Sequence, residues 1–202
     1  YAFLPNVVLI QPAASTSIDL DNPPADGLIP FAQGPMESDA DGVRQATVLF
    51  PPGVTITKTL PGGTPSPITI LDVQVTEYTV GANGLETMPG ELPPTSAYTY
   101  AVELSDPTAL VEGATIAFNP PLPVYIDNFL DFPVGGAVPV GTYDPDLAAW
   151  VPSTDGVILE IVSETGGLAD LDIDGDGNPE DSATLTALGI TDDERARLAD
   201  IF

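Results

Sequence analysis

Aspartates occupy every second position in one short stretch, from Asp170 to Asp176. The stretch continues to Asp181 as DLDIDGDGNPED, so carboxylates, glycines and an asparagine follow one another closely. Repulsion among these carboxylates disfavours a compact turn unless a cation neutralises them. Calcium suits such a run because it takes about six to eight oxygen ligands in a flexible shell. The residues therefore predict a calcium-binding loop.

The loop fits the pattern D-x-[DN]-x-[DN]-G-x5-E in two registers. In the first, which starts at Asp170, acids fall at positions 1, 3 and 5 and Gly175 falls at position 6. Asp181 then closes the shell at position 12 with a shorter carboxylate than the usual glutamate.

The second register starts at Asp172 and again places acids at positions 1, 3 and 5. It has Gly177 at position 6 and Glu180 at position 9, but Ala183 at position 12. This register resembles the D-x-D-G-D-G loops of dockerin-like modules and thrombospondin type-3 repeats. Both registers stay open, as does a solvated acidic turn without an ion. The candidate ligands are Asp170, Asp172, Asp174, Asp176, Asn178, Glu180 and Asp181.

Composition excludes several classes of function. The chain has 202 residues, 30 acidic and 4 basic side chains, a net charge of −26, and neither Cys nor His. So few cations argue against nucleic acid and against anionic lipid head groups as partners. Thiolate and imidazole zinc sites and Ser-His or Cys-His nucleophile pairs are impossible. The chain has no apolar run long enough for membrane insertion, and a hydrophobic content of 43% argues against wholesale disorder.

The chain divides into three parts. Residues 1–45 are expected to form one strand, Asn6 to Ile10, followed by an irregular Pro- and Asp-rich arm over residues 11–42. Residues 46–165 are expected to form a β-sandwich region, with a break near residues 88–97 that would allow two small β units. Residues 166–202 are expected to form an EF-hand- or dockerin-like calcium loop with helices.

The middle part repeats short runs of β-branched and aromatic residues between Pro- and Gly-rich turns. Its predicted strands are residues 46–50, 55–60, 67–80, 98–105, 113–118, 124–129, 138–143, 148–151 and 156–162. The apolar phase slips near Ile70, which indicates a bulge or bend. Alternation places Tyr98, Tyr100, Val102 and Leu104 on one face, which we expect to be core. The absence of intervening helical patterns favours a mainly β fold, a β-sandwich of short antiparallel strands with a C-terminal calcium loop and short helices.

Two short helices are predicted after the acidic loop. Residues 182–188 allow two turns that end at Gly189. Thr191 to Glu194 has the pattern of a capping box, and the helix that follows would bury Leu198, Ile201 and Phe202.

Several strings of residues also resemble a known family. They are residues 46–54, 76–81, 94–105, 125–135, 140–144, 150–153 and 167–177. Together they resemble the β-rich segment upstream of the repeats in large secreted bacterial Rhs/YD-repeat proteins. The strand-Pro-Pro-Gly opening is also similar to the β-sandwich domain of ankyrins and netrin receptors. The first resemblance spans roughly residues 42–202 and implies a secreted, surface-exposed module without catalytic residues. No YD repeat or toxin domain lies in these residues.

Three functions follow as hypotheses. The first is a non-enzymatic extracellular structural or adhesion module, part of a large secreted or surface protein and stabilised by calcium. The second is a self-assembling surface-layer or filament subunit, in which residues 6–10 complement a neighbour's sheet. Its partners would be neighbouring domains or copies of itself.

The third hypothesis is an enzyme that uses two carboxylates, such as a glycoside hydrolase. Glu77, Glu103, Asp127 and Glu160 lie on or beside predicted strands, but acids are abundant throughout the chain. We therefore expect no enzymatic activity. Carbohydrate binding is possible, but no aromatic cluster supports it.

Overall fold

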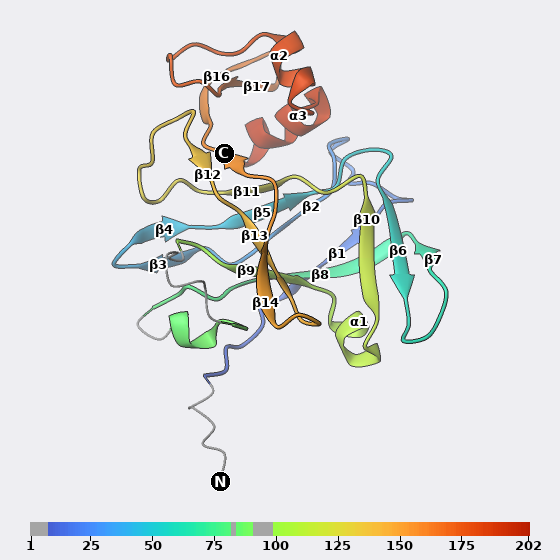
Figure 1. Ribbon diagram of the computed structural model, residues 1–202. Helices are drawn as coiled ribbons and strands as arrows, with labels where there is room; N and C mark the ends of the chain where they lie inside the picture. Colours follow the sequence, from blue (N-terminus) through green and yellow to red (C-terminus); the bar gives the residue numbers. More distant parts are fainter. Residues whose placement is uncertain (1–7, 82–83, 91–98) are drawn as a thin grey trace.

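Antiparallel strands make up most of the regular structure in the computed structural model, which describes residues 8–81, 84–90 and 99–202 (Figure 1). Nine strands form the three largest sheets in this part of the chain. They are β1 (Ser15–Asp19), β2 (Phe31–Gln33), β5 (Ala46–Leu49), β6 (Thr55–Thr59), β7 (Ser66–Ile68), β8 (Ile70–Glu77), β9 (Val102–Ser105), β10 (Thr115–Asn119) and β11 (Val124–Ile126). The sheet orders are β1-β8-β9, β10-β6-β7 and β11-β5-β2.

Shorter two-stranded sheets and helices complete the described fold. The remaining strands are β3 (Glu37–Asp39), β4 (Gly42–Arg44), β12 (Ala137–Val138), β13 (Gly141–Asp144), β14 (Ala149–Pro152), β15 (Gly156–Val157), β16 (Glu160–Thr165) and β17 (Leu168–Asp172). They pair as β3-β4, β12-β15, β13-β14 and β16-β17. The helices are η1 (Gly84–Thr87), α1 (Pro107–Glu112), α2 (Ser182–Ala187) and α3 (Asp192–Ile201). None of these helices has the length and apolar character needed to cross a bilayer.

Strand β5 is buried on both faces and separates two hydrophobic clusters. On one face, Val48 lies with residues of β1 and β8 in the first cluster: Ile18, Ala32, Ala46, Val48, Phe50, Ile56, Leu71, Val73 and Val75. On the other face, Leu49 lies in the second cluster: Ile29, Leu49, Ala169, Leu171, Ile173, Leu185 and Leu198. Alternation of side chains along a strand explains why neighbours enter different clusters. The C-terminal elements therefore pack on the sheet of β5, opposite β8.

Helix α3 is joined to this sheet by the buried side chain of Arg197. Its Nε donates to the carbonyl oxygen of Ile29 at 2.9 Å, and its other nitrogens bond Asp26 at 3.0 Å and Asp200 at 2.8 Å. The guanidinium also lies 4.7 Å from the ring centroid of Phe31. Figure 1 shows β16, β17, α2 and α3 together on the β5 and β11 side of the body.

A second buried cation stabilises the β3-β4 hairpin. Arg44 is 1% exposed and bonds both carboxylate oxygens of Asp39 at 2.8 Å and Glu77 at 2.7 Å. Its guanidinium lies 4.7 Å from the ring centroid of Phe129. Because Arg44, Arg195 and Arg197 are all buried, the surface of this acidic chain is left with very little positive charge.

The prediction of a mainly β fold with a few short helices is confirmed. The bulge or bend predicted near Ile70 is a bend at Thr69, which divides the single strand predicted over residues 67–80 into β7, ending at Ile68, and β8, beginning at Ile70. Both C-terminal helices form, and α3 has the predicted capping box at Thr191 and Glu194.

The prediction of an irregular arm over residues 11–42 is wrong. Strands β1, β2 and β3 lie there, and β1 and β2 pair with β8 and β5. Strand β1 buries mainly Ile18 among polar neighbours, so its sequence lacks an apolar alternation. For the strand predicted at residues 6–10, residues 6 and 7 lie outside the described residues, and residues 8–10 form no strand.

Three further expectations needed correction. Helix α1 was not predicted, although Asp106 caps its N-terminus, Pro107 starts it and Gly113 ends it with a φ of 63°. Leu104 is 44% exposed although its strand was expected to bury it, and Phe202 is 57% exposed at the end of α3. Tyr98 lies outside the described residues.

Candidate metal centre

Strand β17 leads directly into the acidic loop. Ala169, Leu171 and Ile173 point into the second hydrophobic cluster, which fixes where the chain leaves the sheet. Leu171 also accepts a hydrogen bond from the N–H of Glu180 at 2.8 Å, so the two ends of the loop are held together. The loop is therefore anchored on the buried side of the strand.

Asp172 organises the loop through its carboxylate. One oxygen accepts from the N–H groups of Asp174 at 3.1 Å and Gly175 at 2.8 Å, and the other accepts from Gly177 at 2.8 Å. Burial alone would raise the pKa of Asp172, but the N–H donors of Gly175, Gly177 and Asp174 together lower it. Asp172 is therefore held as a carboxylate inside the turn.

The two following aspartates continue the same local pattern. Asp174 accepts from the N–H of Asp176 at 3.1 Å, and Asp176 accepts from the N–H of Asn178 at 2.8 Å. Gly175 and Gly177 have φ values of 81° and 80°, a region that side chains with a Cβ rarely adopt. These turns bring alternate side chains to the same side of the loop.

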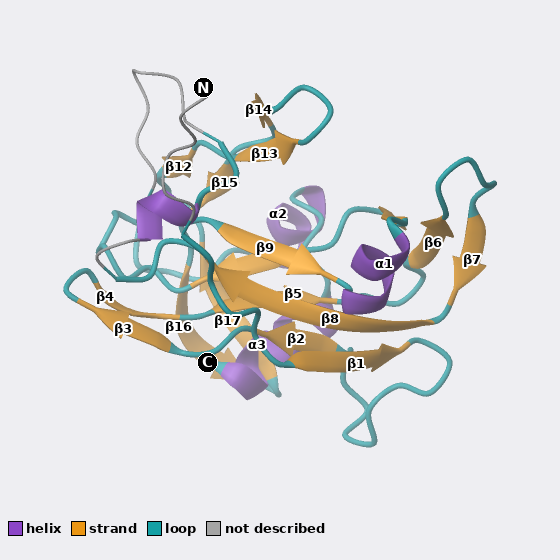
Figure 2. Ribbon diagram, turned by 90° about the horizontal axis from the view of Figure 1, so that it is seen from below, coloured by secondary structure: helices purple, strands orange, loops and turns teal. Residues whose placement is uncertain are grey.

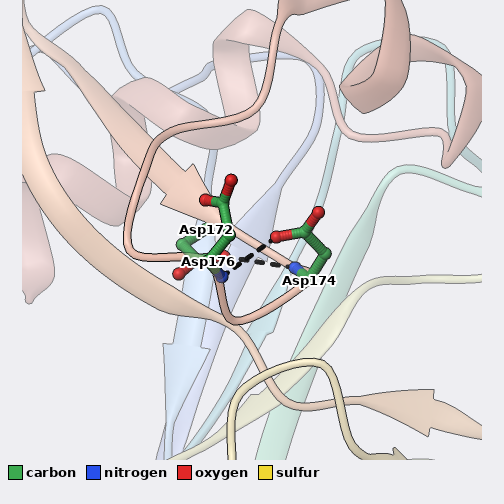
Figure 3. Close-up of side chains that lie close together, drawn as sticks. All are labelled: Asp172, Asp174 and Asp176. Atoms are coloured by element: carbon green, nitrogen blue, oxygen red, sulfur yellow. Dashed lines mark hydrogen bonds between the residues drawn. The ribbon is translucent and has the colours of Figure 1, made fainter.

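Three carboxylates converge in this loop, as Figure 3 shows. Asp172, Asp174 and Asp176 each offer an oxygen within 4.8 Å of the other two, which is close enough to hold a metal ion. They occupy positions 1, 3 and 5 of the register that starts at Asp172, with Gly177 at position 6. Asp172 is buried, and the other two are exposed.

The other predicted ligands have different contacts. Asp170 accepts from the hydroxyls of Ser163 and Thr165 at 2.7 Å and from Arg195 at 3.3 Å, and the two hydroxyls are the main cause of its lowered pKa. Asp181 caps α2 by accepting from the N–H of Thr184 at 2.7 Å.

Asn178 and Glu180 lie farther along the loop. The side-chain nitrogen of Asn178 donates to the carbonyl oxygen of Asp176 at 3.4 Å, and Glu180 bonds Leu171 through its main chain. The full ligand set of an ion remains a prediction.

The salt bridges of the basic side chains go to carboxylates outside the cluster. Arg44 pairs with Asp39 and Glu77, Lys58 with Glu112, Arg195 with Asp170 and Asp192, and Arg197 with Asp26 and Asp200. Within the described part of the chain, no salt bridge neutralises the three clustered aspartates. Their repulsion therefore favours a bound cation.

The loop also packs on a segment that was not predicted to belong to the site. A Cβ on Gly175 would lie 2.8 Å from the carbonyl oxygen of Val134, and one on Gly135 would lie 2.9 Å from that of Asp174. The main chains of the two segments are thus in direct contact. In the sequence, the only hint of this contact is the pair of glycines at residues 135–136.

The carboxylates considered for catalysis lie in separate surroundings. Glu77 pairs with Arg44, whereas Glu103 accepts from the hydroxyl of Tyr78 at 2.5 Å. Burial raises the pKa of Asp127, and Glu160 is exposed on β16.

Comparisons with models of protein families, with curated proteins and with solved structures give no match to this chain. The resemblance to Rhs/YD-repeat proteins therefore remains a prediction from sequence.

Proposed function

We propose that this chain is a non-enzymatic structural or adhesion module of a large extracellular or cell-surface protein, stabilised by calcium. The observation that carries the proposal is the convergence of Asp172, Asp174 and Asp176, three carboxylates that form no salt bridge within the described residues. Acidic oxygen ligands on a flexible loop favour calcium over a metal that requires nitrogen or sulfur ligands. The predicted sandwich with its C-terminal calcium loop belongs to the same proposal.

The position of the loop gives the ion a structural role. The loop joins β17 to α2 and packs on residues 134–135. An ion held by the three aspartates would fix this contact and with it the C-terminal elements on β5. Without the ion, repulsion would loosen the loop and weaken the packing of those elements.

Extracellular calcium is abundant enough to fill a site of moderate affinity, and extracellular modules use such sites. An acidic surface with its arginines buried is consistent with that setting. The resemblance to surface-exposed Rhs/YD-repeat proteins points the same way.

Thermal unfolding tests the proposal. The protein is heated with millimolar calcium, with magnesium at the same concentration, and with a chelator. The ionic strength is high and equal in all three samples. An ion present at about 100 times its dissociation constant stabilises by roughly 2.7 kcal/mol, which raises Tm by about 5–10 °C in a chain of this size. Magnesium should give a much smaller shift.

Two variants decide where the ion binds. Asp174→Ala should abolish the calcium-dependent rise in Tm, whereas Asp155→Ala, at another exposed aspartate, should keep it. Equal shifts with calcium and magnesium, or a calcium shift that survives Asp174→Ala, would refute the proposed site.

A further inference from the structure

An apolar groove of about 200 Å³ lies between β9 and β10 and is partly open to solvent. Its floor consists of core side chains from β5, from the residue that follows β5, and from β8, and Ile116 and Phe118 of β10 form one wall. The floor residues are Val48, Phe50, Leu71 and Val73. An opening that reaches the first hydrophobic cluster would be stabilised by an apolar occupant.

Strand β9 presents its edge to the groove. Three consecutive residues of β9, Glu103 to Ser105, line the groove, so both faces of the strand border it. The N–H of Tyr78 donates to the carbonyl oxygen of Ala101, and the alternation of antiparallel pairing then directs the main-chain groups of Val102 and Leu104 away from β8. No other described strand pairs with this edge. The groove therefore offers both hydrogen-bonding groups and an apolar surface to an added strand.

Charge limits which segment can enter the groove. Glu103 and Asp106 lie along the β9 side, so an acidic segment would be repelled. Residues 1–18 contain no charged side chain, although the whole chain has a net charge of −26. Within this uncharged segment, Val8, Leu9 and Ile10 have the branched apolar side chains that a strand over an apolar groove requires.

The segment before β1, residues 8–14, pairs with none of the strands that the structure describes. Leu9 is 86% exposed, and residues 8–14 form no strand. Ala13 is tied to β8, because its N–H donates to Thr76 Oγ1 at 3.0 Å and its carbonyl accepts from Gln74 at 2.9 Å. The segment that carries the exposed Leu9 is therefore held on β8 through Ala13.

Strand β1, which follows the segment, and the groove lie on opposite edges of one sheet, whose order is β1-β8-β9. Figure 1 shows the blue segment before β1 leaving the body, and Figure 2 shows β1 and β9 on the two sides of β8. Ala13 bonds the side chains of Gln74 and Thr76, which point to the face of β8 opposite the core residues Leu71, Val73 and Val75, so the segment lies on the face of the sheet opposite the floor of its own groove. It is placed to reach the β9 edge of another molecule.

We propose that residues Val8–Ile10 of one molecule add as a strand to β9 of a second copy, with apolar side chains in the groove between β9 and β10. The contact is heterologous, since the donor and acceptor surfaces differ. Repetition of such a contact produces rings or open chains of subunits. This interaction does not depend on the proposed calcium site.

A complementation experiment tests the interaction by light scattering after size exclusion. The unmodified chain should show a mass that rises with concentration. Leu9→Asp, which alters the donor, and Leu104→Glu, which alters the acceptor, should each be monomeric. An equimolar mixture of the two variants should form a species of two chains and no larger one, because only one intact donor–acceptor pair can form in it.

Controls separate this result from misfolding and from other occupants. Val111→Asp, at a residue that is 89% exposed and outside the groove, should assemble like the unmodified chain. Both assembly variants should keep the Tm and its calcium-dependent rise. A peptide of residues 6–14 should bind a chain that lacks residues 1–12 at least ten times more tightly than a scrambled peptide.

Three outcomes would overturn the proposal. In the first, the unmodified chain is monomeric and binds no peptide. In the second, both variants still assemble. In the third, the mixture of the two variants stays monomeric. Loss of the calcium response with assembly intact would instead refute the proposed metal site alone.

Discussion

Gly135 lies against the main chain of Asp174, so that a Cβ on Gly135 would come within 2.9 Å of the Asp174 carbonyl oxygen. The reciprocal contact joins Gly175 to Val134. The acidic loop is therefore held from two sides, by β17 and by residues 134–135. A change in this contact should alter the geometry of the three clustered aspartates.

Two glycines in the loop provide a matched test of that contact. Gly175 and Gly177 have nearly equal φ values, 81° and 80°, so alanine causes similar backbone strain at both. Only at position 175 does the added Cβ meet another segment. Gly175→Ala should destabilise the protein by about 1–3 kcal/mol more than Gly177→Ala, measured by urea unfolding with calcium. Equal losses would show that the contact with Val134 has no effect on stability.

Replacement of the buried Arg197 should lower the free energy of unfolding more than replacement of the partly exposed Lys58. Arg197→Met leaves the carbonyl oxygen of Ile29 without its donor and removes the contact with Phe31. We expect a loss of about 2–4 kcal/mol in the free energy of unfolding. Lys58→Met removes only a surface pair with Glu112 and should cost at most about 1 kcal/mol. Similar small losses for both variants would contradict a role for Arg197 in holding α3 on the sheet of β5.

Monovalent salt should stabilise the protein independently of calcium. The chain has a net charge of −26, and its buried arginines leave the surface acidic. Screening of surface repulsion should raise Tm by several degrees between about 10 mM and 1 M sodium chloride, in the presence of a chelator. Calcium at constant high salt should add a further rise. A Tm that is independent of sodium chloride would show that surface repulsion contributes little.

Acid should destabilise the protein through Asp39. Hydrogen bonds from Arg44, and then from the N–H groups of Asp41 and Gly81, hold the pKa of Asp39 well below its ordinary value of 3.8. Its stabilising contribution is therefore complete above the ordinary pKa and declines as the pH falls below about 4 toward the lowered value. Urea unfolding from pH 6 to pH 3 should show this decline, and Asp39→Asn should make it shallower. Asp155→Asn should leave the slope unchanged.

Much of the β-pattern could be predicted from sequence because alternating β-branched residues lie between Pro and Gly turns. Strands β5, β6 and β10 match their predicted ranges closely. Strand β1 could not be predicted in the same way, because its pairing with β8 depends on main-chain bonds and a single buried side chain, Ile18. Strand β17 was missed because the acidic pattern of its residues hid the buried Ala169 and Leu171.

The candidate site was predicted in part. Alternating aspartates and the two loop glycines indicated where carboxylates would gather. Sequence spacing could not show that Asp170 bonds Ser163 and Thr165, since both hydroxyls lie on the neighbouring strand β16. The groove beside β9 could not be predicted from sequence either, because it depends on which strand edges remain unpaired in the folded chain.

Direct calcium binding tests the central claim most sharply. Isothermal titration calorimetry of the calcium-free protein at high ionic strength should show saturable binding at the cluster. Asp174→Ala should weaken that binding at least tenfold, and Asp155→Ala should leave it unchanged. Absence of calcium binding to the unmodified protein, or binding that Asp174→Ala leaves intact, would contradict a metal site formed by Asp172, Asp174 and Asp176.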